Sequence, residues 1–161
     1  MLSSIVQRLC WLVMMLCLMG TSAYAQLLYA SDPAGLVKAM RDLNYSAELG
    51  TDSEGDPKIT GTVHGREYTI YFYSCTDNTN CHNILFFMVY SPPEPVALET
   101  INSWNIGNIA GHGGIADDGS VVLQHFVTLT GGITRWNFED TLSWWAYLVK
   151  AFGAEIGVIV E

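Results

Sequence analysis

The chain is poor in basic residues. Its 161 residues include 7 lysines and arginines against 16 aspartates and glutamates, which gives a formal net charge of −9. The few basic residues are scattered, so no basic cluster offsets this balance locally. A protein with such a charge repels phosphate backbones. The composition therefore argues against nucleic acid as a partner.

Long hydrophobic runs are also missing. The one extended apolar run covers residues 9–19, far fewer than the roughly 20 residues needed to cross a bilayer. Arg8 precedes this run, and the small-residue triplet Ala23, Tyr24 and Ala25 follows it. This pattern is typical of a secretory signal peptide. We predict a signal peptide over residues 1–25, a periplasmic or secreted mature protein, and no integral membrane segment after cleavage.

Cysteine is scarce in the predicted mature chain. Cys10 and Cys17 lie in the signal peptide, so only Cys75 and Cys81 remain. In an oxidising compartment this pair predicts a short disulfide loop across a hairpin, which would stabilise the fold by about 2 kcal/mol. A zinc site completed by His64 and His82 is the alternative, although the spacing matches no common ligand pattern.

Internal repeats, low-complexity stretches and linkers are absent from residues 26–161, which indicates a single domain. Hydrophobic periodicity predicts helices over residues 32–44 and 98–107 and a third that starts at Asn137. Glu139 and Asp140 would then occupy the first turn of the last helix, where negative charge is favoured. The tail at 154–161 could form either a docked strand or a helical extension.

Alternating side chains and turn signals predict strands over six segments: 45–49, 58–63, 66–75, 82–90, 110–116 and 120–130. The segment 82–90 is apolar on both faces, so we expect it to be central and covered on both sides. The order is α-β-β-β-β-α-β-β-α. It predicts an α+β fold in which helices pack mainly on one face of an antiparallel sheet of about five to six strands.

Several segments resemble the YbjN-like family, and together they span most of the predicted mature chain. They are GDPKITG at 55–61, YFYSC at 71–75, INSWN at 101–105, DDG at 117–119 and GGI at 131–133. The most specific is INSWN, with the motif residues Ile101, Asn102, Trp104 and Asn105. The resemblance implies a fold similar to type III secretion chaperones and a role as a sensory transduction regulator, without generally established catalytic residues.

No coherent catalytic set accompanies this resemblance. The histidines at 64, 82, 112 and 125 fall on four different elements, and His125 alternates with valines and leucines as a core residue would. The segment GHGG at 111–114 resembles an esterase oxyanion loop, but the nucleophile motif G-x-S-x-G is missing. Asp52, Glu54 and Asp56 alternate without the spacing of a calcium-binding EF-hand. We therefore predict no enzyme activity, no cofactor and no metal.

An excess of apolar residues points instead to an interaction surface. If the helices cover one face of the sheet, the opposite face presents five large side chains: Tyr71, Tyr73, Leu85, Phe87 and Val89. Because water is a poor neighbour for such a face, we expect a second copy, a partner polypeptide or the C-terminal tail to close it.

Two function classes follow from these observations. The first is an exported, non-catalytic interaction protein, chaperone-like or a sensory accessory, that binds another polypeptide. The alternative is a periplasmic ligand- or metal-binding protein that uses the histidines or the acidic turn. The resemblance to secretion chaperones favours the first class and a homodimer.

Overall fold

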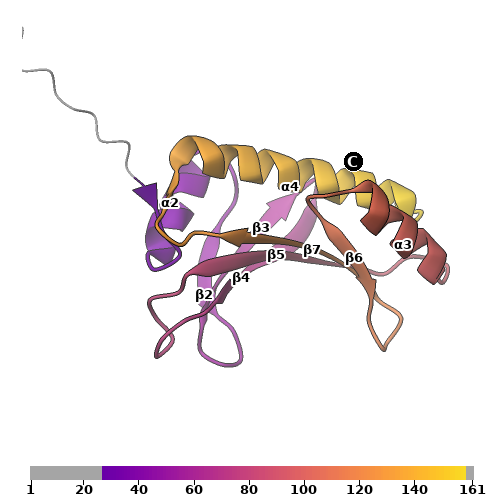
Figure 1. Ribbon diagram of the computed structural model, residues 1–161, viewed down its shortest axis with the longest axis horizontal. Helices are drawn as coiled ribbons and strands as arrows, with labels where there is room; N and C mark the ends of the chain where they lie inside the picture. Colours follow the sequence, from indigo (N-terminus) through magenta and orange to yellow (C-terminus); the bar gives the residue numbers. More distant parts are fainter. Residues whose placement is uncertain (1–26, 159–161) are drawn as a thin grey trace, which may run out of the picture.

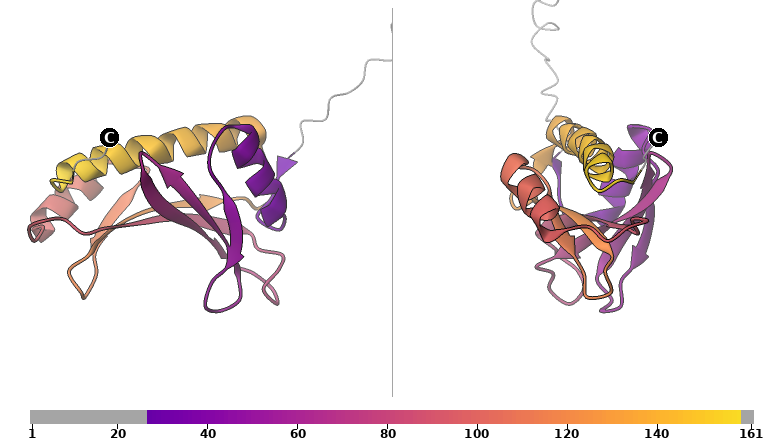
Figure 2. Two further views of the ribbon diagram at one scale, coloured as in Figure 1. Left: turned by 180° about the vertical axis from the view of Figure 1, so that it is seen from behind. Right: turned by 90° about the vertical axis from the view of Figure 1, so that its right-hand side faces the viewer.

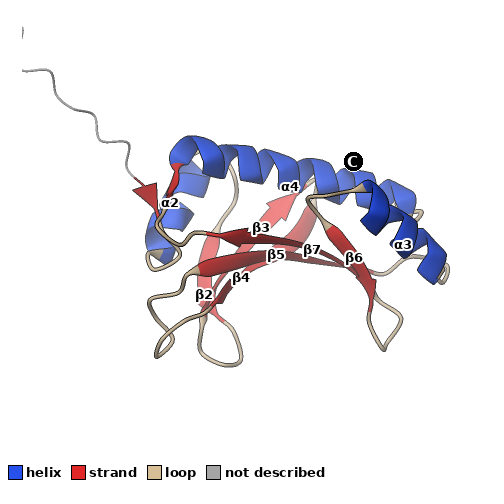
Figure 3. Ribbon diagram, viewed as in Figure 1, coloured by secondary structure: helices blue, strands red, loops and turns tan. Residues whose placement is uncertain are grey.

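The computed structural model describes residues 27–158, so the predicted signal peptide and residues 159–161 lie outside the described part. Six strands form one antiparallel sheet in the order β2-β3-β4-β5-β7-β6. Their bounds are β2 Glu48–Thr51, β3 Pro57–Val63, β4 Arg66–Tyr73, β5 Asn83–Tyr90, β6 His112–Ile115 and β7 Val121–Thr128. The helices are α2 Pro33–Asp42, α3 Leu98–Gly107 and α4 Arg135–Glu155. The predicted α+β class is confirmed (Figure 3), and the predicted element order holds apart from two additional two-residue strands described below.

The helices lie on one face of the sheet (Figure 1). The long helix α4 runs across that face, and α2 and α3 lie near its opposite ends (Figure 2). The predicted apolar stripe of α4 is confirmed, because all five of its residues are buried: Phe138, Leu142, Trp145, Val149 and Phe152. They pack with the inner face of the central strands, which contributes Ile70, Ile84, Phe86, Met88 and Leu123.

The first helix has the predicted start. Asp32 is its N-cap, and the Asp32 carboxylate accepts a hydrogen bond of 2.9 Å from the Gly35 amide. The strand predicted at 45–49 lies slightly later, at Glu48–Thr51. The Arg41 guanidinium donates to the Ala47 carbonyl at 2.7 and 3.0 Å, which ties this part of the chain to α2 before pairing with β3 begins.

The last helix begins earlier than predicted. Thr134, not a residue next to Asn137, is its N-cap, and the Thr134 hydroxyl accepts from the Asn137 amide at 3.2 Å. Glu139 and Asp140 are therefore not in the first turn, and the helix-dipole explanation for their charge is wrong. The sequence pattern also missed a two-stranded sheet of β1 (Leu27–Leu28) and β8 (Ile133–Thr134), because two residues are too few to show a period.

The chain beyond α4 forms neither a docked strand nor a helical extension as far as it is described. Ile156 caps the helix, and the Val158 amide donates to the Gly153 carbonyl at 2.8 Å. The side chains of Ile156 and Val158 are both buried and belong to the core that the helices and the inner face of the sheet share. The described tail thus leaves the other face of the sheet open.

Strand β5 is central in the sheet, but the described chain covers only one of its two faces. The strand lies between β4 and β7, as predicted. Its inner residues Ile84, Phe86 and Met88 are buried, but Val89 on the other side is 51% exposed. Within residues 27–158, the prediction that both faces of this strand are covered is therefore wrong.

Candidate functional site

The open face of the sheet has an apolar centre. The strand register places Tyr71 of β4 opposite Leu85 of β5, and Leu85 opposite Phe126 of β7. The five residues predicted as an interaction surface share this face, and Phe126 joins them. We refer to these six residues as the outer-face patch: Tyr71, Tyr73, Leu85, Phe87, Val89 and Phe126.

The outer-face patch is ordered by contacts within the sheet but remains accessible. The rings of Tyr71 and Phe87 meet edge to face with centroids 5.8 Å apart. Phe126 and Val89 are 58% and 51% exposed, and Leu85 is half-buried. Sequence reasoning missed Phe126, although it alternates with the inward-facing Leu123 and His125 of the same strand. That alternation was the signal that would have found it.

Polar side chains border the patch on several sides, and Val122 of β7 extends its apolar surface beside Val89. Lys58 lies beside Tyr71, Thr69 beside Phe87, and Gln124 pairs with Phe87 from the other side. No acidic side chain lies among the six patch residues, although the chain as a whole is acidic. The six patch residues can therefore contact another apolar surface without burying a charge of their own, and the carboxylate of Glu67 lies farther along β4 on the same face.

The family motif on α3 holds the helix to strand β6. The Asn105 side chain donates to the Gly113 carbonyl at 3.1 Å and accepts from the Gly113 amide at 2.8 Å. The Trp104 indole donates to the Gly111 carbonyl at 3.2 Å. Ile101 is buried, whereas Asn102 is exposed. Trp104 and Asn105 thus have a structural role, and only Asn102 remains available for recognition.

The glycines in GHGG are explained by close packing. A Cβ on Gly113 would lie 2.7 Å from the Phe152 ring of α4, and one on Gly111 would lie 3.0 Å from Leu148. This segment brings β6 against α3 and α4, and the lack of a side chain at Gly111 and Gly113 allows that close approach.

The disulfide between Cys75 and Cys81 is present and closes the connection from β4 to β5. Asn78, at the tip of this loop, donates to the Asp56 carboxylate and to the Glu54 carbonyl, each at 3.0 Å. The Asp52 carboxylate accepts from the Glu54 and Asp56 amides at 3.0 and 2.9 Å. The alternating acidic residues therefore form a turn that supports the disulfide loop.

The four histidines are not gathered into a site. The His125 ring hydrogen-bonds to the Ala110 carbonyl, and the His64 ring nitrogen Nε2 lies 3.1 Å from the Ala146 carbonyl oxygen. Burial lowers the pKa of His125, and His112 on the neighbouring strand lowers it further, while the Ala110 hydrogen bond raises it. Within residues 27–158, no group of three or more histidine, cysteine or acidic side chains is placed to hold a metal ion.

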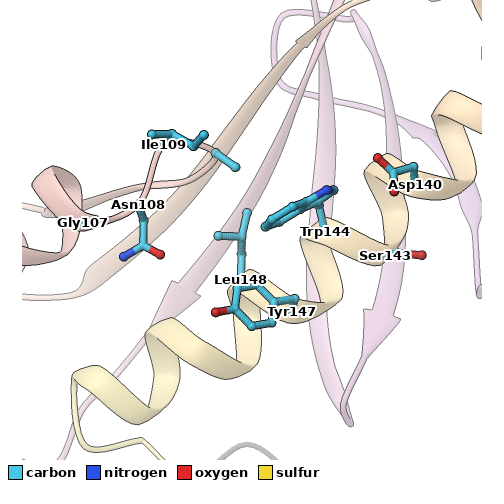
Figure 4. Close-up of a pocket in the computed structure, with 9 residues that line it drawn as sticks. Gly107, Asn108, Ile109, Asp140, Ser143, Trp144, Tyr147 and Leu148 are labelled. Atoms are coloured by element: carbon cyan, nitrogen blue, oxygen red, sulfur yellow. The ribbon is translucent and has the colours of Figure 1, made fainter.

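A second candidate site is a groove between α4 and residues 107–110, with a volume of about 550 Å³ (Figure 4). It is lined by Gly107, Asn108, Ile109, Ala110, Asp140, Ser143, Trp144, Tyr147 and Leu148. Sequence reasoning used Trp145 of this helix and missed Trp144 and Tyr147. The available signal was two aromatic residues that fall outside the apolar stripe of α4.

The comparisons with known proteins apply to most of the described chain and not to one site. No helix in the described part of the chain combines the length and apolar character that a membrane crossing requires. A search of curated proteins finds no match. The family model YbjN, described as "Putative bacterial sensory transduction regulator", matches residues 32–157. The match covers most of the chain, including the residues of both faces of the sheet. The chain therefore belongs to the YbjN family.

Proposed function

We propose that this protein is exported and acts as a non-catalytic regulatory module that binds another polypeptide through the outer-face patch. The observation that supports this proposal most directly is an apolar patch at the centre of a sheet face that the described chain leaves open. The family description, a regulator and not an enzyme, agrees with a binding role.

The position of the patch favours recognition over a purely structural use. Its residues come from the three central strands, which the surrounding core holds rigid. Exposed apolar patches rimmed by polar residues are typical of protein interaction sites. Aromatic side chains such as Tyr71, Phe87 and Phe126 are common in the central parts of such interfaces.

We further propose that a second copy of the chain closes this face in the absence of a partner. A two-fold axis through the middle of β5 would place the same apolar residues on both sides of the interface, as a symmetric dimer requires. Two sheet faces pack about 10 Å apart with their side chains interdigitated. A client polypeptide would then compete with the second copy for the same surface.

The test is in-cell crosslinking and purification of the exported protein, combined with light scattering of the purified chain. Phe87→Asp and Phe126→Asp place a charge in the patch without entering the core, because both side chains point away from α4. We expect each to remove the captured partner and to convert the dimer to a monomer. The matched control is Thr62→Asp, an exposed position on the neighbouring strand β3 outside the patch.

Two results would contradict the proposal. One is a wild-type protein that is monomeric and captures no partner. The other is assembly and capture that persist unchanged in both patch variants. Unfolding midpoints of all variants, measured in parallel, separate lost binding from lost folding.

A further inference from the structure

The groove beside α4 has a different chemistry from the outer-face patch and lies on the helix side of the molecule. Its floor is apolar: Leu148 is buried, and Figure 4 shows Trp144 and Leu148 directed from α4 toward residues 107–110. Ile109 of that segment is 97% exposed. A volume of about 550 Å³ is within the range of sites that bind small chemical groups.

Two aromatic rings stand at the edge of this groove. The rings of Trp144 and Tyr147 are perpendicular, with centroids 5.8 Å apart. They are 47% and 58% exposed, whereas the core-facing Trp145 beside them is buried. The faces of exposed indole and phenol rings attract cations through their quadrupoles. These two residues contribute little to the core and are available to a ligand.

The polar lining of the groove is dominated by hydrogen-bond acceptors. Asp140 lies one helical turn before Trp144, and its carboxylate makes no hydrogen bond or ion pair within residues 27–158. The Asn108 amide nitrogen already donates to the Trp104 carbonyl at 3.1 Å, and the Ser143 hydroxyl donates to the Glu139 carbonyl at 2.9 Å. None of the nine lining residues is basic.

The charge of Asp140 has no structural explanation of its own. The helix dipole favours a carboxylate in the first turn of a helix. Because α4 begins at Arg135, Asp140 lies beyond that turn and is not stabilised in this way. An unpaired carboxylate beside two exposed aromatic rings is complementary to a positively charged group on an apolar stem. The acidic balance of the whole chain adds a long-range attraction for such a group.

We propose that this groove binds an arginine or lysine side chain presented by a peptide segment of a partner protein. The apolar stem lies against Ile109 and Leu148, and the cationic head lies between Asp140 and the ring of Trp144 or Tyr147. A peptide fits better than a free cation, because exposed apolar surface continues beside the groove at Ile106, which is 77% exposed. This site is independent of the outer-face patch, which lies on the opposite face of the sheet.

The first experiment compares two peptides that differ only in charge, acetyl-Leu-Arg-Leu-amide and its citrulline twin, by calorimetry with the mature chain 26–161. We expect the arginine peptide to bind at least about fivefold more tightly, the size of a cation–π contact together with an ionic one. Added salt should reduce this difference. Equal affinity of the two peptides would overturn the proposal.

Variants locate the site. Asp140→Asn is nearly isosteric and should remove most of the preference for arginine over citrulline, and Trp144→Leu should weaken both peptides. Trp136→Leu is the control, because Trp136 is an exposed tryptophan on α4 outside the groove. Unchanged binding in Asp140→Asn would also overturn the proposal, even if Trp144→Leu failed to fold.

Two further arms separate the alternatives. Butylguanidinium that binds as tightly as the arginine peptide would identify a small organic cation as the ligand and exclude the peptide. Phe126→Asp should leave arginine-peptide binding intact, so that failure of the outer-face patch and failure of this groove give different results.

Discussion

Burial and a hydrogen bond to a backbone carbonyl shift the pKa of His125 in opposite directions. Burial favours the neutral imidazole and is the larger effect, so the pKa lies below its ordinary value despite the hydrogen bond to Ala110. Nearby His112 acts in the same direction as burial. The ring also packs against Phe86, with centroids 6.0 Å apart. This residue connects β7 to the segment that borders the α4 groove.

The lowered pKa of His125 predicts a loss of stability in acid. Between the folded pKa and the unfolded value near 6.5, the unfolded chain binds more protons, so the free energy of unfolding falls as the pH falls. Each pH unit between the two pKa values contributes about 1.4 kcal/mol. Urea unfolding at pH 7.5 and 5.5 should show this decrease, and His125→Gln should reduce it.

His112→Gln is the matched control for this prediction, because it removes the neighbouring charge and keeps the half-buried ring of His125. We expect it to reduce the pH dependence less than His125→Gln does. A wild type and a His125→Gln variant that lose the same stability between the two pH values would show that other groups cause the decrease.

At the scale of elements, α3, β6 and the end of α4 form one interlocked unit. Asn105 is bonded twice to Gly113, and the Phe152 ring lies directly over that glycine. Trp104 and Phe152 meet edge to face with centroids 5.0 Å apart. The short strand β6 is thereby protected at the edge of the sheet.

Gly113→Ala tests this interlock. The added methyl group would lie 2.7 Å from the Phe152 ring, so either the ring or the strand must shift. Overpacking of this kind costs about 1–3 kcal/mol. Gly107→Ala is the control, because nothing lies within 4 Å of a Cβ at that position. Chemical denaturation of both variants should show a clear loss for the first and none for the second; similar stabilities would contradict the close packing.

At the scale of the whole molecule, the described chain has two surfaces of different chemistry on opposite layers. The sheet presents the outer-face patch, and the helix layer presents the groove beside α4, which is lined by Asp140, Trp144 and Tyr147 (Figure 4). The two proposed sites together would let the protein hold one polypeptide on the sheet and a basic segment on the helices at the same time. Such a double contact suits a regulator that brings two chains together.

Export is the remaining proposal at this scale. We expect the full chain, expressed in a bacterium, to appear outside the cytoplasm with Gln26 as its first residue and with Cys75 and Cys81 protected from alkylation. Mass spectrometry of cell fractions measures both properties. Leu12→Arg combined with Leu16→Arg interrupts the apolar run and should block export. An intact chain with two reactive thiols at 75 and 81 in the cytoplasm would contradict the proposal.

Much of the fold was predictable because its signals are local. The N-cap at Asp32, the turn at Asp117 to Gly119 and the alternation in β4 and β5 each depend on neighbouring residues, and the structure confirms them. The start of α4 was misplaced because Thr134 competes with later residues as a cap. The β1–β8 pair was missed because it joins residues more than 100 positions apart.

For the candidate sites too, the local features were predictable from the sequence and the long-range ones were not. The sequence alone determined that Tyr71 and Tyr73 share one face of their strand and that Leu85, Phe87 and Val89 share one face of theirs, because alternation along a strand is a local property. Only the tertiary structure decided that this face is open within residues 27–158, that Phe126 joins it, and that Asp140, Trp144 and Tyr147 meet residues 107–110 in a groove. Those outcomes depend on which strands become neighbours and where α4 lies, and such long-range packing leaves no period in the sequence.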